Sequence, residues 1–131
     1  MCFSWRGNSS FKDISAFLFC YNSLFGNNLA FLNRQNGIRV TLKTTSIEKA
    51  RQLTKKNHPE IAILGIGMFN QEGYYALLSF WQEEGIPVIV LGLDDKEEEE
   101  ALKRGAYAFF RKGESYPELV AAIKKIGGGV T

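Results

Sequence analysis

The sequence predicts an α/β protein with one domain, in which helices cover both faces of a parallel five-stranded β-sheet. Three observations lead to this fold class. Five short apolar runs are separated by helix-length segments, two of the central runs are apolar throughout, and the connections are short. Regular alternation of this kind is typical of a parallel sheet with a helix in each crossover. The length of 131 residues fits one domain with its own core.

The apolar runs have the length and composition of strands, and they lie at residues 16–20, 38–42, 61–66, 88–91 and 108–110. The runs 61–66 and 88–91 contain no polar side chain, which is typical of central strands buried on both faces. In the run 38–42, apolar residues alternate with Arg39 and Thr41. This alternation indicates an edge strand with one polar face.

The segments between the runs predict helices that begin near Leu24, Thr45, Tyr74, Asp94 or Asp95, and Ser115. Two of these starts, at residues 45–48 and 115–118, have the form of a capping box. Pro59 is expected to end the second helix and Gly105 the fourth. The fourth helix offers only Ala101 and Leu102 as apolar anchors, so we expect it to be loosely held.

The domain is expected to cover residues 13–126. Residues 1–12 mix Gly, Asn and Ser with scattered aromatic side chains, which indicates an irregular N-terminal arm. Residues 127–131 form a glycine-rich tail. This tail is either a frayed end or the start of a linker into a further domain, and glycine runs do not decide between the two.

Composition and charge exclude several classes of function. The net charge of +2 is too small for a protein that coats nucleic acid, although residues 1–60 carry +6 and residues 61–131 carry −4. A single histidine, His58, excludes multi-histidine metal sites. Two cysteines favour a reduced, cytoplasmic chain over a disulfide framework. No apolar run has the length of a membrane span.

Three segments, 59–73, 86–91 and 105–112, have the sequence features of a third strand with its loop, a fourth strand, and a fifth strand followed by a lysine. In this order and spacing they make residues 17–126 resemble a response-regulator receiver domain, similar to CheY. The resemblance implies a flavodoxin-like (βα)5 three-layer sandwich with strand order 2-1-3-4-5.

The residues that perform phosphoryl transfer in this family are largely replaced. An acyl phosphate needs a carboxylate nucleophile, and Mg²⁺ needs hard oxygen ligands, yet residues 14–23 and 61–71 contain no acidic side chain. The resemblance therefore implies a pseudo-receiver without catalytic residues, metal or cofactor. Its degenerate pocket comprises Tyr21 and Asn22 in place of the metal-binding acidic pair, Gly65 in place of the phosphoacceptor aspartate, Gly92 in place of the Ser or Thr, and the retained Lys112.

The resemblance also implies a partner surface made of the fourth helix, the fifth strand and the fifth helix. The run Glu97–Glu100 is either a solvated helix face or an acidic docking surface, and basic residues surround it. Phe109 holds the place of the family's switching aromatic residue and is expected to stay in one state. We expect partner binding, or a homodimer, through Glu99, Glu100, Lys103, Phe109, Arg111 and Lys124.

The sequence thus predicts a signalling module that is not an enzyme and works without phosphorylation, through a protein partner or a fused output domain such as a helix-turn-helix. The alternative is a small-molecule sensor that uses space left at Gly65, Gly67 and Gly92, unless Tyr21, Met68 and Phe69 fill it. The basic segment 49–56 lacks a base-reading pattern, so direct nucleic-acid binding is not expected. No nucleophile–base pair supports an enzyme.

Overall fold

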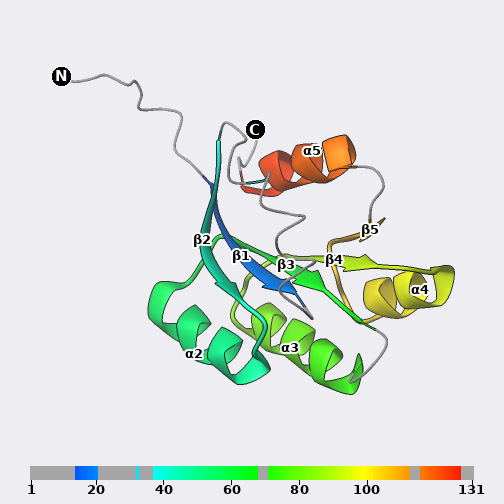
Figure 1. Ribbon diagram of the computed structural model, residues 1–131, viewed down its shortest axis with the longest axis horizontal. Helices are drawn as coiled ribbons and strands as arrows, with labels where there is room; N and C mark the ends of the chain where they lie inside the picture. The colour runs from blue at the N-terminus through cyan, green and yellow to red at the C-terminus, as the bar shows by residue number, and fades with distance from the viewer. Residues whose placement is uncertain (1–13, 21–31, 33–36, 68–70, 113–115, 128–131) are drawn as a thin grey trace.

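The computed structural model describes residues 14–20, 32, 37–67, 71–112 and 116–127, and it contains the five strands that the sequence predicts. They pair in parallel in the order β2-β1-β3-β4-β5, which confirms the predicted fold (Figure 1). Strand ends differ from the prediction by one or two residues. The strands are β1 (Ile14–Cys20), β2 (Ile38–Thr44), β3 (Ile61–Gly65), β4 (Val88–Gly92) and β5 (Ala108–Arg111).

Four helices are described, and they lie on both faces of the sheet (Figure 1). The helices α2, α3 and α4 pack on one face and α5 on the other. The predicted first helix, near residues 24–35, lies outside the described residues except for the buried Leu32. None of the described helices is long and apolar enough to cross a membrane. The helices are α2 (Ile47–Asn57), α3 (Gln71–Glu83), α4 (Asp95–Lys103) and α5 (Tyr116–Gly127).

The core is divided by the sheet into two apolar layers, because successive strand residues point to opposite faces. Phe17 and Leu64 pack under α2 and α3, while Leu18 and Ile63 pack under α5. On the first face the fully buried Trp81 is the largest side chain of the core. Its indole N–H donates to the Thr54 hydroxyl at 2.8 Å, which links α3 to α2 and satisfies both buried polar groups.

Two details of the helices differ from the prediction. The N-cap of α2 is Ser46, whose hydroxyl accepts from the Lys49 amide at 3.2 Å, so the predicted capping box at residues 45–48 is wrong. The reason is that β2 continues to Thr44 and moves the helix start by one residue. In α4, Leu102 is not an anchor, because 45% of its surface is exposed.

Candidate functional site

The carboxyl ends of the parallel strands meet at one edge of the sheet, where open α/β folds commonly place their ligands. Gly65 ends β3 and pairs with Leu91 of β4. The Lys112 amide donates to the Gly92 carbonyl oxygen at 2.9 Å, so these two residues also lie at this edge. The fold therefore brings Gly65, Gly92 and Lys112 together at this edge. Tyr21 and Asn22 follow β1 in the sequence and lie outside the described residues.

Among the described residues, the environment of Gly65 contains no carboxylate nucleophile and no set of metal ligands. Gly65 is buried and has no side chain, and its partner across the sheet is the buried Cys20 at the end of β1. Burial raises the pKa of the Cys20 thiol to about 12, although the charges of Lys43 and Lys112 oppose this shift, so the thiol is neutral at pH 7. Among the residues that the structure describes, no three His, Cys, Asp or Glu side chains are placed to hold a metal ion.

The space above Gly92 is filled by two other side chains. A Cβ atom at this position would lie 2.7 Å from Oε1 of Glu97 and 2.8 Å from the ring of Phe109. Both distances are well below ordinary van der Waals contact. The φ angle of Gly92 is not positive, so its backbone conformation does not require glycine. Glycine is favoured here only because a Cβ atom would come too close to Glu97 and Phe109. The space at Gly92, which the alternative of a small-molecule sensor would use, is therefore occupied by Glu97 and Phe109.

Glu97 is the residue that sequence reasoning missed. The sequence placed it either on a solvated helix face or on an acidic docking surface, and both interpretations need an exposed side chain. Only 8% of its surface is exposed, so neither describes Glu97. Its Oε1 accepts from the amides of Leu93 at 2.5 Å and Asp94 at 3.3 Å, and its Oε2 accepts from Gln71 Nε2 at 2.9 Å. Asp94 Oδ1 in turn accepts from the Glu97 amide at 2.9 Å, which completes a capping box. The three-residue spacing of Asp94 and Glu97 was the signal available in the sequence.

Lys112 is half-buried at the same edge of the sheet. Its ammonium group donates to the Ile66 carbonyl oxygen just beyond β3. Burial lowers the pKa of Lys112 to about 8, while the negative charge of Glu97 acts to raise it, as does Cys20. Lys112 therefore remains mostly protonated at pH 7, with a carboxylate of the same chain as an electrostatic partner.

A family model for the response regulator receiver domain matches residues 23–124. The chain belongs to the response regulator receiver family. Its fold matches a putative response regulator from Chloroflexus aurantiacus at 22% identity, covering 88% of this chain and 98% of that one with a TM-score of 0.74. It also matches the response regulator domain of Thermotoga maritima CheB (18% identity, 92% and 100% covered, TM-score 0.73).

A third similar structure is a chain of the CheX–CheY–BeF3–Mg complex from Borrelia burgdorferi, at 17% identity. The match covers 86% of this receiver and 88% of that chain, with a TM-score of 0.72. No curated protein matches the sequence. At these identities the solved structures show the receiver fold.

The residues predicted for the partner surface of the receiver fall into separate groups. Glu99 and Lys103 are exposed on α4. The guanidinium of Arg111, on β5, donates to the Leu93 carbonyl oxygen at 2.7 Å and pairs with Asp95 at the start of α4. This pairing ties β5 to α4, so Arg111, Glu99 and Lys103 lie on two connected elements.

The other three predicted partner residues lie elsewhere. Glu100 pairs with Arg104 at a groove between α3 and α4. Phe109 packs over the end of β4 and against the core. Lys124 lies on α5, where its Cε is 3.9 Å from a Cβ built at Gly37, close to the start of the edge strand β2. The fold therefore does not gather all six residues on one patch.

Proposed function

We propose that this receiver domain signals without phosphorylation, by binding a protein partner or a fused output domain. The observation that carries the proposal is the space above Gly92, which holds the carboxylate of Glu97 and the ring of Phe109. The family's Ser or Thr at this position does not fit there without displacing one of them. The absence of any acidic residue in the sequence 61–71 supports the same conclusion, because no carboxylate is available to attack a phosphoryl donor.

The negative charge of Glu97 further supports the proposal that the pocket does not bind a phosphoryl group. A phosphoryl group brings up to two negative charges. Glu97 already brings one to this part of the pocket, and its field acts on Lys112. A second anion here is repelled by Glu97, and no metal-binding carboxylates are present in the sequence 14–23 to offset that repulsion.

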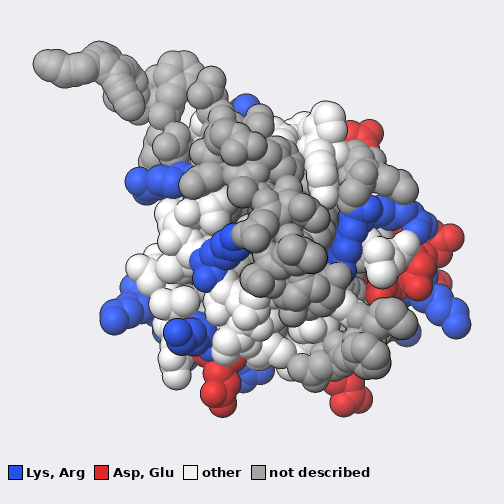
Figure 2. Space-filling model, viewed as in Figure 1, with Lys and Arg blue, Asp and Glu red and all other residues white. Residues whose placement is uncertain are grey.

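The surface of α4 and β5 supports a protein-binding role. Figure 2 shows acidic and basic side chains interleaved over α4, and the sequence places Glu99 and Lys103 among them. Large apolar side chains are exposed on or beside the same two elements: Leu102 at 45%, and Leu93 and Tyr107 at 51% each. A mixture of opposite charges with exposed apolar groups fits a protein interface, including a symmetric homodimer in which acidic residues meet basic ones.

The alternative of a small-molecule sensor is disfavoured by the same observation. Glu97 and Phe109 fill the part of the pocket next to Gly92, where a ligand would replace the phosphoryl group. We therefore retain the interaction module as the function of this domain.

The proposal is tested by incubating the protein with Mg²⁺ and acetyl phosphate and measuring its intact mass. We expect no hydroxylamine-sensitive adduct, and no chemical-shift change at Gly65, Gly92 or Lys112 when beryllofluoride and Mg²⁺ are added. The B. burgdorferi CheY, whose structure with CheX contains beryllofluoride and Mg²⁺, is the positive control. A hydroxylamine-sensitive phosphate adduct on the wild-type chain contradicts the proposal.

A further inference from the structure

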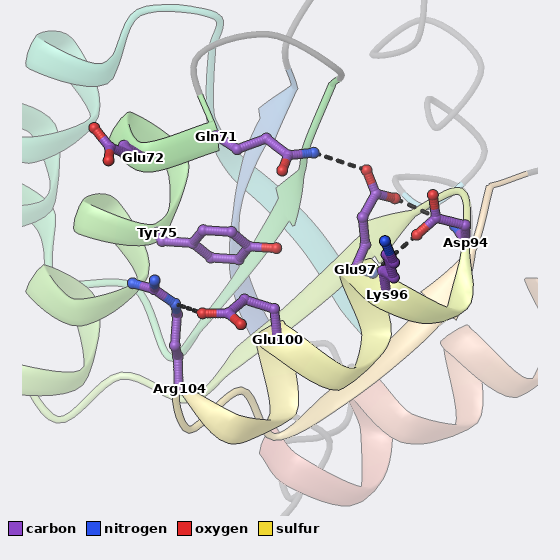
Figure 3. A pocket seen from close by; sticks show the side chains of 8 residues that line it. All are labelled: Gln71, Glu72, Tyr75, Asp94, Lys96, Glu97, Glu100 and Arg104. Carbon is purple, nitrogen blue, oxygen red and sulfur yellow. Dashed lines mark hydrogen bonds and ion pairs between the residues drawn. The ribbon is translucent and has the colours of Figure 1, made fainter.

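A groove of about 410 Å³ lies between α3 and α4 and adjoins the degenerate pocket, with which it shares Glu97 (Figure 3). Its lining is rich in charge: four carboxylates and two cations, contributed by Glu72, Asp94, Glu97, Glu100, Lys96 and Arg104. The excess of carboxylates gives the groove a net charge of −2 at pH 7 and attracts cations. Glu72 forms no hydrogen bond or ion pair with any described residue, so its charge is not neutralised by a contact there.

Tyr75 of α3 provides a second and independent observation. Only 5% of its surface is exposed, and its hydroxyl points into the groove between Glu97 and Glu100 (Figure 3). None of the described residues forms a hydrogen bond with this hydroxyl. The ring of Tyr75 is buried while its hydroxyl reaches a groove open to solvent, so a ligand that enters the groove can supply the partner that tyrosine hydroxyls usually have. Burial raises the pKa of Tyr75, and the carboxylates of Glu97 and Glu100 raise it further, so the group stays a neutral O–H at pH 7.

The chain itself shows which chemical group suits this environment. The guanidinium of Arg104 lies over the Tyr75 ring at 4.6 Å from its centroid and pairs with Glu100. A planar guanidinium has several donors, so it can stack on an aromatic ring and bond to a carboxylate at once. In Figure 3 the Tyr75 hydroxyl points away from Arg104, and the space around it is flanked by carboxylates.

We propose that the groove between α3 and α4 binds an arginine side chain of a partner protein, with its guanidinium between the Tyr75 hydroxyl and the carboxylate of Glu100. The hydroxyl accepts one N–H of the guanidinium, and Glu100 accepts another. The groove is open to solvent, where a free cation stays hydrated and screened by salt. An arginine held in a protein interface is excluded from water by its neighbours and binds more strongly. This site lies on the side of α4 that faces α3, away from the exposed surface of α4 and β5 described above. The proposal holds whether or not the degenerate pocket can be phosphorylated.

The test is an NMR titration of the ¹⁵N-labelled protein with a capped glycine pentapeptide that has one central arginine. We expect chemical-shift changes at the amides of Gln71, Tyr75, Glu100 and Arg104. The same peptide with citrulline, which has the same shape without the charge, is expected to cause none. Free agmatine, tested at the same concentration, is expected to bind more weakly than the arginine peptide.

Two pairs of variants locate the contact. Tyr75→Phe removes only the hydroxyl and is expected to weaken arginine-peptide binding about ten-fold, whereas Tyr107→Phe, at an exposed tyrosine outside the groove, leaves it unchanged. Glu100→Gln is expected to weaken binding several-fold. Glu99→Gln changes the net charge equally on the same helix but lies outside this groove, so it is expected to have no effect.

Several results overturn the proposal. Equal binding of the citrulline peptide excludes guanidinium recognition, and shift changes confined to other surfaces exclude this groove. Agmatine binding as tightly as the peptide makes the groove a small-cation site instead. An unchanged affinity in Tyr75→Phe excludes the hydroxyl as a ligand. A marked fall in the melting temperature of Tyr75→Phe shows that the hydroxyl is bonded within the fold, which removes the argument for a ligand.

Discussion

Glu97 is predicted to stabilise the receiver through its carboxylate, although acidic side chains on helix surfaces usually contribute little. In Glu97→Gln, one side-chain oxygen remains to accept from the Leu93 amide, which lies 2.5 Å from Oε1 in the wild type. The new amide nitrogen faces Gln71 Nε2, which is also a donor, and the charge at the helix N-terminus is lost. Hydrogen bonds to charged groups contribute about 1.5–3 kcal/mol each, and the glutamine retains part of this.

We therefore expect Glu97→Gln to lower the free energy of unfolding by about 1–2 kcal/mol, a large effect for a conservative change on a helix. The assay is urea denaturation at pH 7, followed by circular dichroism, with equal m-values required for the comparison. Glu99→Gln is the matched control, because Glu99 is exposed on the same helix and its loss is expected to cost less than about 0.5 kcal/mol. Equal stabilities of the two variants refute the assignment of Glu97 as an anchor of α4.

Three further predictions concern the pocket. Gly92→Ser restores the family's hydroxyl but is expected to lower the free energy of unfolding by about 1–3 kcal/mol, because its Cβ overlaps Glu97 and Phe109. The measurement is urea denaturation, and a variant as stable as the wild type contradicts this prediction. Gly65→Asp alone is expected to give no acyl phosphate by mass spectrometry, whereas adding Tyr21→Asp and Asn22→Asp is expected to create Mg²⁺ affinity first, measured by calorimetry. Burial lowers the pKa of Lys112 from 10.5 to about 8, so its protonated form is disfavoured in the folded state. The stability of the wild type relative to Lys112→Met is therefore expected to rise between pH 8 and pH 10 in urea titrations; a flat difference contradicts the shift.

The sheet was predictable from the sequence because its strands differ in burial. The strands β3 and β4 are covered on both faces and appear as continuous apolar runs, while the edge strand β2 alternates polar and apolar residues. The carboxyl ends of such strands necessarily meet, which places Gly65, Gly92 and Lys112 at one edge of the sheet. The contact between Lys112 and the Ile66 carbonyl oxygen, 46 residues apart, also follows from the order of the strands.

The occupants of the pocket were not predictable in the same way. Whether Glu97 turns outward or back over Gly92 depends on the geometry of the short β4–α4 connection, which apolar periodicity does not report. The four consecutive glutamates made a solvated face the natural interpretation, and yet the capping box with Asp94 turns the first of them inward. The groove between α3 and α4 depends on residues 20 or more positions apart, such as Tyr75 and Glu100, and on the angle between two helices.

The hydrogen bonds of Glu97 also set a requirement for any signal that moves α4. The carboxylate joins the β4–α4 connection to Gln71 of α3, so displacing α4 breaks at least two charge-assisted hydrogen bonds, about 3–6 kcal/mol in all. A ligand shifts the equilibrium between the held and the displaced position of α4 only by the difference between its binding free energies for the two positions. A protein that binds with micromolar affinity gains about 8 kcal/mol of binding free energy. This gain exceeds the cost of the broken hydrogen bonds if most of the protein's contacts form only when α4 is displaced. A domain whose α4 is held by its own carboxylate is thus suited to respond to an interface of many contacts, on α4 and β5 or in the groove beside Tyr75.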